Sequence, residues 1–182
     1  MRIIGGKYRG KKLISPVSQN IRPTSDKARE AVFNILRSRL NGQFGKLSLI
    51  DVFAGSGAFA LEALSQGFAK VAMVDIDTKD LLKNVALFAN EKEKITVVKS
   101  DINNIPQSGS KFDVLFMDAP YNKGMTEIAL EKMMSFLNDG ALCIIELEKN
   151  ERCSLPDGYK LVDERKYGIA KFLIAEFILQ SF

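Results

Sequence analysis

The fold is decided by the stretch Asp51-Val-Phe-Ala-Gly55-Ser-Gly57-Ala-Phe-Ala60, which joins an apolar run to a helical pattern. Residues 47–53 predict a buried strand, and residues 58–66 predict a helix. Glycines at such a junction let the backbone turn sharply and approach a ligand. The helix N-terminus adds free N–H groups, so the stretch predicts a ligand-binding loop at the edge of an open α/β sheet.

Strands and helices continue to alternate after this stretch. Further strands are expected over residues 71–74, 95–98, 112–117, 141–146, 159–163 and 172–177. Helices are expected over residues 79–89 and 125–137. The last two strands have no helix between them and are joined by Arg165-Lys-Tyr-Gly168, which suits a hairpin. The pattern predicts an α/β fold with a mostly parallel sheet, covered on both faces and containing one antiparallel strand.

A basic extension precedes this α/β body. Residues 1–40 carry ten Lys and Arg side chains against two acids, whereas the whole chain has a net charge of only +4. Residues 1–14 predict a small hairpin around Gly5-Gly6. A helix is expected to begin at Ser25 or Thr24 and to end at Asn41-Gly42. We expect an extension over residues 1–45 that binds a polyanion, followed by the body over residues 46–182.

Composition excludes several classes of protein. The 182 residues suit one domain, no apolar run reaches the length of a membrane span, and the opening residues lack the apolar segment of a signal peptide. A cytoplasmic protein is therefore expected. The chain has no histidine, which excludes Ser-His-Asp and Cys-His triads and most catalytic zinc sites, so no metal is expected. Cys143 and Cys153 are expected to be reduced packing residues.

The glycine loop fits two kinds of cofactor. Gly55-x-Gly57-x-x-Ala60, with Asp75 twenty residues after Gly55, matches the dinucleotide fingerprint. Nicotinamide dinucleotides and S-adenosylmethionine (SAM) both carry an adenosine ribose. Asp75, or the neighbouring Asp77, would therefore bind ribose hydroxyls in either case.

Two further acids bear on this choice. Asp51 favours SAM, because a carboxylate just before the glycines can meet the methionine ammonium group and would repel a pyrophosphate. Asp101 follows the third expected strand and could accept a hydrogen bond from the adenine amine.

The tetrapeptide Asp118-Ala119-Pro120-Tyr121 ends the strand expected over residues 112–117. Methyl transfer to an amine requires acceptors for the N–H protons and a flat ring held in place. A carboxylate and a backbone carbonyl supply the acceptors, and a tyrosine supplies a stacking face. Proline stiffens the turn that presents them. The alternative is an ordinary strand-to-loop turn.

Several segments together resemble the bacterial 16S ribosomal RNA guanine-N2 methyltransferases of the RsmD type. The resemblance spans nearly the whole chain and is most specific at its beginning. It rests on Arg2-Ile-Ile-Gly-Gly-Lys-Tyr-Arg-Gly10, Ile21-Arg-Pro-Thr-Ser-Asp-Lys-Ala-Arg-Glu30-Ala-Val-Phe-Asn34, the glycine loop and Leu61-Glu-Ala-Leu-Ser65. The family usually has proline where this chain has Ala119, a change that keeps the backbone carbonyl.

The resemblance implies a class I SAM-dependent methyltransferase fold, Rossmann-like, with seven strands of which the last is antiparallel. It also implies SAM as methyl donor and N2 of one guanine in 16S rRNA, within the small ribosomal subunit or an assembly intermediate, as acceptor. The expected catalytic residues are Asp118, Ala119, Pro120 and Tyr121. The expected cofactor residues are Asp51, Phe53, Ala54, Gly55, Ser56, Gly57, Asp75, Ile76, Asp101 and Ile102. The expected RNA contacts are Arg2, Lys7, Arg9, Lys11, Lys12, Arg22, Thr24, Lys27 and Arg29.

Three other functions fit parts of the sequence. The first is methylation of a different amine, such as adenine N6 or a base of another RNA. The second is nicotinamide-dependent oxidoreduction, although no residue suited to the accompanying proton transfer is apparent. The third is RNA binding by a fold that has lost catalysis. SAM binding, measured by calorimetry, separates the first from the other two, and activity on unmodified ribosomal subunits separates the third.

Overall fold

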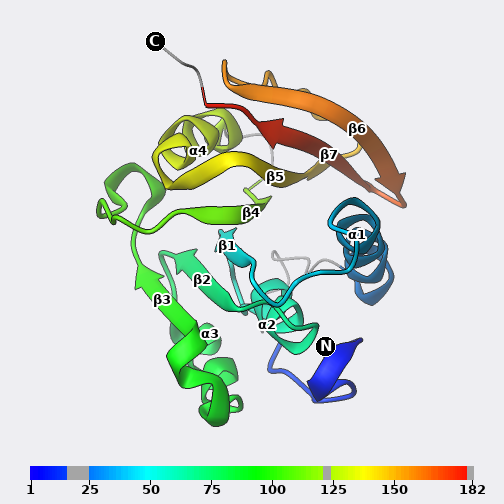
Figure 1. Ribbon diagram of the computed structural model, residues 1–182, viewed down its shortest axis with the longest axis vertical. Coiled ribbons are helices and arrows are strands. Elements are labelled where there is room, and N and C mark those ends of the chain that lie inside the picture. Colours follow the sequence, from blue (N-terminus) through cyan, green and yellow to red (C-terminus); the bar gives the residue numbers. More distant parts are fainter. Residues whose placement is uncertain (16–24, 121–123, 180–182) are drawn as a thin grey trace.

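The computed structural model describes residues 1–15, 25–120 and 124–179 of the chain. Its centre is a seven-stranded sheet with the order β3-β2-β1-β4-β5-β7-β6 (Figure 1). The strands are β1 (Ser48–Val52), β2 (Lys70–Asp75), β3 (Ile95–Lys99), β4 (Phe112–Asp118), β5 (Leu137–Glu148), β6 (Tyr159–Tyr167) and β7 (Ala170–Phe177). Strands β1 to β5 pair in parallel, and β7 is antiparallel to both of its neighbours. The predicted class I methyltransferase architecture is confirmed.

Helices cover both faces of the sheet (Figure 1). Alternate residues of each buried strand face opposite sides, so Leu49 of β1 packs in one hydrophobic cluster and Ile50 in the other. The first cluster receives α1 (Asp26–Arg39), α2 (Ala58–Ser65) and α3 (Lys79–Ala86), and the second receives α4 (Met125–Met133). Among the described residues, no helix is long and apolar enough to cross a membrane.

Several element boundaries differ from the prediction. The helix expected over residues 79–89 ends at Ala86, and a 3-10 helix, η2 (Ala89–Lys94), follows it. The helix expected to reach residue 137 ends at Met133 and continues as the 3-10 helix η4 (Met134–Phe136). The β6 strand runs on to Tyr167, so the β6–β7 hairpin turns at residues 168–169 rather than over residues 165–168.

The N-terminal extension follows a hairpin path with little strand character. A single antiparallel bridge joins Arg2 to Lys12, and the intervening turn contains the 3-10 helix η1 (Gly6–Tyr8). Gly6 has a φ of +75°, and a Cβ on it would lie 1.9 Å from the carbonyl oxygen of Ser65 at the end of α2. Only glycine allows the extension to approach α2 this closely.

The extension and α1 share the core of the body. Ile3 and Leu13 of the extension and Phe33 of α1 are buried in the same cluster as Phe59 of α2. The N-cap of α1 is Ser25, one of the two residues that the sequence offers for this position, and its side chain accepts a hydrogen bond from the backbone of Ala28. The division at residue 45 stays a prediction about function.

Candidate active site

The glycine loop lies at the carboxyl end of β1 and opens α2. Phe53 begins the turn with a φ of +63°, and Ala54 closes it by accepting a 2.7 Å hydrogen bond from the N–H of Gly57. Gly57 caps α2 at a φ of +75°, and a Cβ there would lie 2.8 Å from Sδ of Met73. A side chain at residue 57 would therefore both strain the backbone and collide with β2.

Asp51 lies beneath this loop with 1% of its surface exposed. Its carboxylate accepts a 3.2 Å hydrogen bond from the backbone of Ala60 in α2. Burial raises the pKa of Asp51 well above the ordinary value, and the nearby carboxylate of Asp75 raises this pKa further. A cation placed against Asp51 would relieve this electrostatic cost, which suits the ammonium group expected there.

Asp75, at the end of β2, holds the glycine loop from the other side. One of its carboxylate oxygens accepts a 2.7 Å hydrogen bond from the N–H of Gly55, and the other accepts a 2.9 Å bond from the N–H of Asp77. The Asp77 carboxylate accepts from the backbone of Lys79 at the start of α3. The structure thus brings Asp75, rather than Asp77, into contact with the loop.

The remaining expected cofactor residues follow β2 and β3. Ile76 comes directly after Asp75 and is 65% exposed, so it offers an apolar surface at this edge. Asp101 follows β3 and accepts hydrogen bonds from the backbone and the side chain of Asn103. Ile102 is buried beside it. These residues lie at the same carboxyl edge of the sheet as the glycine loop, since β1, β2 and β3 are parallel.

Asp118 ends β4, the strand next to β1, where Met117 pairs with Val52. On its other side Asp118 pairs in register with Glu146 of β5, which is buried. Burial raises the pKa of Asp118 well above its ordinary value, and the charges of Glu146, Asp51 and Glu151 raise it further. Ala119 is buried and Pro120 is exposed, whereas Tyr121 lies outside the described residues.

One expected RNA contact is wrong. Arg29 is 1% exposed and donates hydrogen bonds to the carbonyl of Arg2 and the carboxylate of Asp26. Its Nε lies 3.9 Å from the buried carboxylate of Glu62. Because α1 turns this residue toward α2 rather than toward solvent, its guanidinium joins three elements of the protein and cannot reach a phosphate.

The other basic residues divide into two groups. Lys7 contacts Glu91, Lys11 contacts the carbonyl of Leu87, and Arg2 pairs with Asp26, although all three side chains keep some exposure. A second group is exposed and has no ion-pair partner within the described ranges: Arg9, Lys12 and Lys27. Arg22 and Thr24 lie outside the described residues. We therefore expect the second group to be the more available to RNA.

Sequence reasoning missed four residues that shape this region. Glu62 accepts from the backbone of Ile4 and Gly5, and Glu91 accepts from Lys7 and Tyr8. The others are Asn84, which is buried on α3, and Glu146 beside Asp118. Glu62 lies in the segment Leu61–Ser65 that carries the family resemblance, and no motif marks the other three, because each acts through a partner distant in sequence. For Glu62, Asn84 and Glu146 the one signal was a polar residue within an apolar helical or strand pattern, whereas Glu91 lies in a charged run without such a signal.

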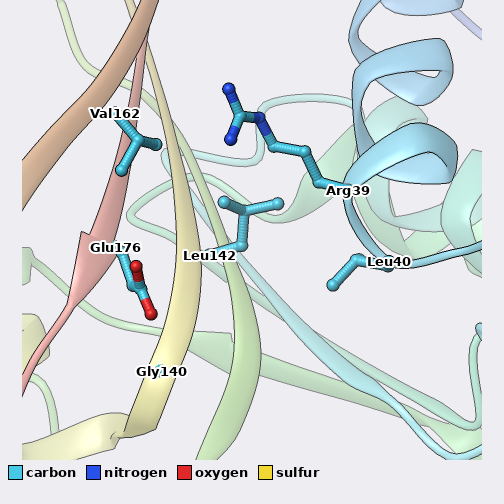
Figure 2. A pocket seen from close by; sticks show the side chains of 6 residues that line it. All are labelled: Arg39, Leu40, Gly140, Leu142, Val162 and Glu176. Carbon is cyan, nitrogen blue, oxygen red and sulfur yellow. The ribbon is translucent and has the colours of Figure 1, made fainter.

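A separate groove lies away from this edge. It is formed between the C-terminus of α1 and strands β5, β6 and β7, with a volume of about 200 Å³ (Figure 2). Its lining residues are Arg39, Leu40, Gly140, Leu142, Val162 and Glu176. Gly140 and Leu142 precede Glu146 along β5, so the groove is nearer the amino end of this strand and is distinct from the site at Asp118.

Comparison with known proteins decides the family. A family model described as "Conserved hypothetical protein 95" matches residues 1–176. The chain belongs to this family. Curated relatives of the chain include proteins named "Ribosomal RNA small subunit methyltransferase D", so the resemblance to the RsmD type is confirmed.

Two relatives and one solved structure illustrate the similarity. The Haemophilus influenzae relative is 32% identical over 180 residues, covering 94% of this chain and 91% of its own. The Escherichia coli K12 relative is 34% identical over 174 residues, covering 92% and 85%. A solved Escherichia coli structure, which carries a provisional methyltransferase name, is 31% identical with a TM-score of 0.84 and covers 99% of both chains.

Proposed function

We propose that the protein transfers a methyl group from SAM to the exocyclic N2 amine of a guanine in 16S rRNA. The observation that carries this proposal is the position of Asp118 one strand away from the glycine loop, at the same edge of the sheet. Relatives whose similarity covers 94% and 92% of this chain are named as ribosomal RNA small subunit methyltransferases. The basic extension provides the charge that an RNA substrate requires.

The residues present fit SAM. Beside Gly55 there is open space, because a Cβ built there would meet no atom within 4 Å. Asp75 and Asp51 lie on either side of the loop and can accept from ribose hydroxyls and from an ammonium group, respectively. The Asp75 carboxylate keeps acceptor capacity after its bonds to Gly55 and Asp77, since each oxygen has two lone pairs. The exposed Ile76 side chain and Asp101 would border the adenine.

The cofactor, when bound, supplies an electrophilic methyl group. Asp118 would accept one N–H of the guanine amine and orient the lone pair toward that methyl carbon. The carbonyl of Ala119 would accept the other N–H, and Pro120 would restrict the turn that presents both groups. Tyr121 would stack on the guanine ring.

The proton balance requires no histidine. With the cofactor bound, the amine nitrogen would gain the methyl group as the carbon–sulfur bond of the cofactor breaks, and the nitrogen would then release one proton. The Asp118 carboxylate can take this proton, because its raised pKa makes it a stronger base than an ordinary aspartate. Water is an alternative acceptor, since a methylated amine cation is acidic.

Transfer of tritium from labelled SAM to small ribosomal subunits that lack this modification tests the proposal. We expect labelled N2-methylguanosine after nucleoside digestion, and label that appears about 10²–10³-fold more slowly with Asp118→Ala. Labelled N6-methyladenosine would instead establish another amine as the acceptor. Absence of label, with SAM binding intact, would favour a noncatalytic RNA-binding protein. Absence of SAM binding would overturn the cofactor assignment.

A further inference from the structure

The side chain of Asn84 links the glycine loop to the N-terminal extension. Asn84 belongs to α3 and has no exposed surface. Its Oδ1 accepts a 2.8 Å hydrogen bond from the N–H of Ile14, and its Nδ2 donates to the carbonyl of Ile14 at 3.0 Å. The same nitrogen donates to the carbonyl of Ser56 at 2.9 Å. The side-chain amide thus pairs with both the N–H and the carbonyl of Ile14, as a neighbouring strand would. Its second N–H binds the glycine loop at Ser56.

The extension and the loop also meet directly. The Ser56 hydroxyl lies 3.9 Å from Sδ of Met1, and Ser56 is buried. Gly55, the preceding residue, is held by the Asp75 carboxylate at 2.7 Å. Side chains therefore hold two successive residues of the loop. Asp75 binds Gly55, and Asn84 binds Ser56.

The residues that follow α3 also anchor the basic turn of the extension. Lys11 donates to the carbonyl of Leu87, and the ring of Tyr8 packs edge-on against Phe88 at a centroid distance of 5.0 Å. Lys7 and the Tyr8 hydroxyl both donate to Glu91 of η2. The α3–η2 segment therefore contacts the extension along its length, while Arg9 and Lys12 of the same turn stay exposed.

We propose that Asn84 is a positioning residue that couples RNA binding to cofactor binding. This inference rests on the proposed function, since it takes RNA and SAM as the two ligands. A cofactor that contacts the Gly55–Gly57 loop would further restrict the Ser56 carbonyl, and through Asn84 it would restrict Ile14 and the extension. RNA that binds this restricted extension loses less conformational entropy of the protein. Each ligand therefore raises the affinity for the other.

The chemistry of the amide makes the proposal specific. Asn84 uses its acceptor and both of its N–H groups, so an isosteric carboxylate cannot replace it. Asn84→Asp keeps the acceptor for the Ile14 N–H but places an oxygen against the carbonyls of Ile14 and Ser56. Asn84→Ala removes all three hydrogen bonds. Lys83→Ala is the matched control, because Lys83 lies on the same helix, is exposed and pairs only with Asp80 among the described residues.

The experiment measures the dissociation constant of S-adenosylhomocysteine by equilibrium dialysis, with and without saturating unmodified small subunits. The non-reactive cofactor product is used so that no methyl transfer occurs during the measurement. For the wild type and Lys83→Ala, we expect the subunits to lower the dissociation constant of S-adenosylhomocysteine by about fivefold or more. S-adenosylhomocysteine should lower the dissociation constant of the subunits by the same factor. For Asn84→Ala and Asn84→Asp, we expect a factor near one in both directions.

Thermal unfolding of each variant shows whether it folds. If the Asn84 variants do not fold, Lys11→Met serves instead, because it removes the contact with the Leu87 carbonyl just after α3 without touching the glycine loop. It should also lower the coupling factor, which is the ratio of the two dissociation constants of S-adenosylhomocysteine. A direct loss of RNA affinity does not change this ratio, because the subunits are saturating. Coupling absent from the wild type, or unchanged in the folded Asn84 variants or in Lys11→Met, would overturn the inference.

These outcomes differ from those of the proposed function. If N2-methylguanosine forms without coupling, only the role of Asn84 fails. If coupling is present but the methylated base is not guanine, the acceptor assignment fails and the inference holds. If S-adenosylhomocysteine does not bind at all, both proposals fail.

Discussion

The Asp75 carboxylate lies 2.7 Å from the backbone nitrogen of Gly55, and this hydrogen bond joins the end of β2 to the glycine loop. One acid therefore shapes the loop while it retains lone pairs for the ribose hydroxyls of a cofactor. Asp77 accepts only from the start of α3 among the contacts described. The geometry separates two neighbouring acids that sequence alone left as alternatives.

Asp75→Ala should weaken SAM binding by about 1.5–3 kcal/mol, the contribution of hydrogen bonds to a charged group. Calorimetry with SAM measures this loss, and Asp77→Ala is the matched control with a smaller expected effect. An unchanged dissociation constant in Asp75→Ala, together with a large loss in Asp77→Ala, would transfer the ribose contact to Asp77.

Asp51→Asn should stabilise the protein in the absence of cofactor while weakening SAM binding. Because the pKa of Asp51 is raised in the folded state, its contribution to stability falls as the pH rises from the ordinary aspartate pKa through the raised value. The neutral amide avoids this loss. We expect the variant to be more stable than the wild type at pH 7, where the carboxylate is disfavoured by burial. Urea unfolding at pH 4 and pH 7 measures this gain, and a gain equal at both values would contradict the electrostatic explanation.

Asp118→Ala should lower turnover by about 10²–10³-fold, the effect of removing one preorganised polar contact worth about 2.7–4 kcal/mol. SAM affinity should change little. In the wild type, turnover should rise with pH through the raised pKa of Asp118, because only the carboxylate accepts from the amine and takes its proton. Turnover at saturating SAM and RNA, measured against pH, should lose this rise in Asp118→Asn. Wild-type turnover in either variant would remove Asp118 from the mechanism.

The two groups of basic residues should respond differently to charge removal. Replacing Arg9, Lys12 and Lys27 together with alanine should weaken RNA binding and make the slope of log K against log salt less steep by about 2–3, since each phosphate contact contributes about 0.7–0.9. SAM affinity should stay at the wild-type value. Filter binding across a salt series measures the slope. Arg29→Ala is the comparison, because its buried side chain should affect stability and leave the slope unchanged.

Glu91→Gln should reduce stability by about 1–3 kcal/mol at neutral pH, because it weakens hydrogen bonds to a charged group. Donation from Lys7, then from Lys94 and Tyr8, lowers the pKa of Glu91 to about 2. Because the pKa of Glu91 is lower in the folded state than the unfolded value of 4.5, ionised Glu91 stabilises the fold above about pH 4.5. This contribution is lost as the pH falls toward 2. Thermal unfolding between pH 2 and pH 7 should show a smaller decline in the variant. An identical decline would mean that Glu91 does not hold the extension.

Much of the fold was predictable because its signals are local. The glycine loop, the alternating apolar patterns and the Ser25 cap each involve residues close in sequence, and each is present in the structure, although several helix and strand ends differ from the prediction. The final antiparallel strand followed from the missing helix between residues 163 and 172. Asp51, Asp75 and Asp118 share one edge of the sheet because parallel strands bring their carboxyl ends together.

The tertiary structure alone decided which polar side chains are solvated. Arg29 and Lys27 look equivalent in the sequence, yet one is buried against Glu62 and the other is exposed. Asn84 reaches Ile14 across 70 residues, and Glu91 reaches Lys7 across 84. Periodicity specifies the face on which a side chain lies, whereas desolvation depends on what a distant segment places against that face. The sequence therefore determined the fold and the acids at its edge, and only packing determined the partners of the basic extension.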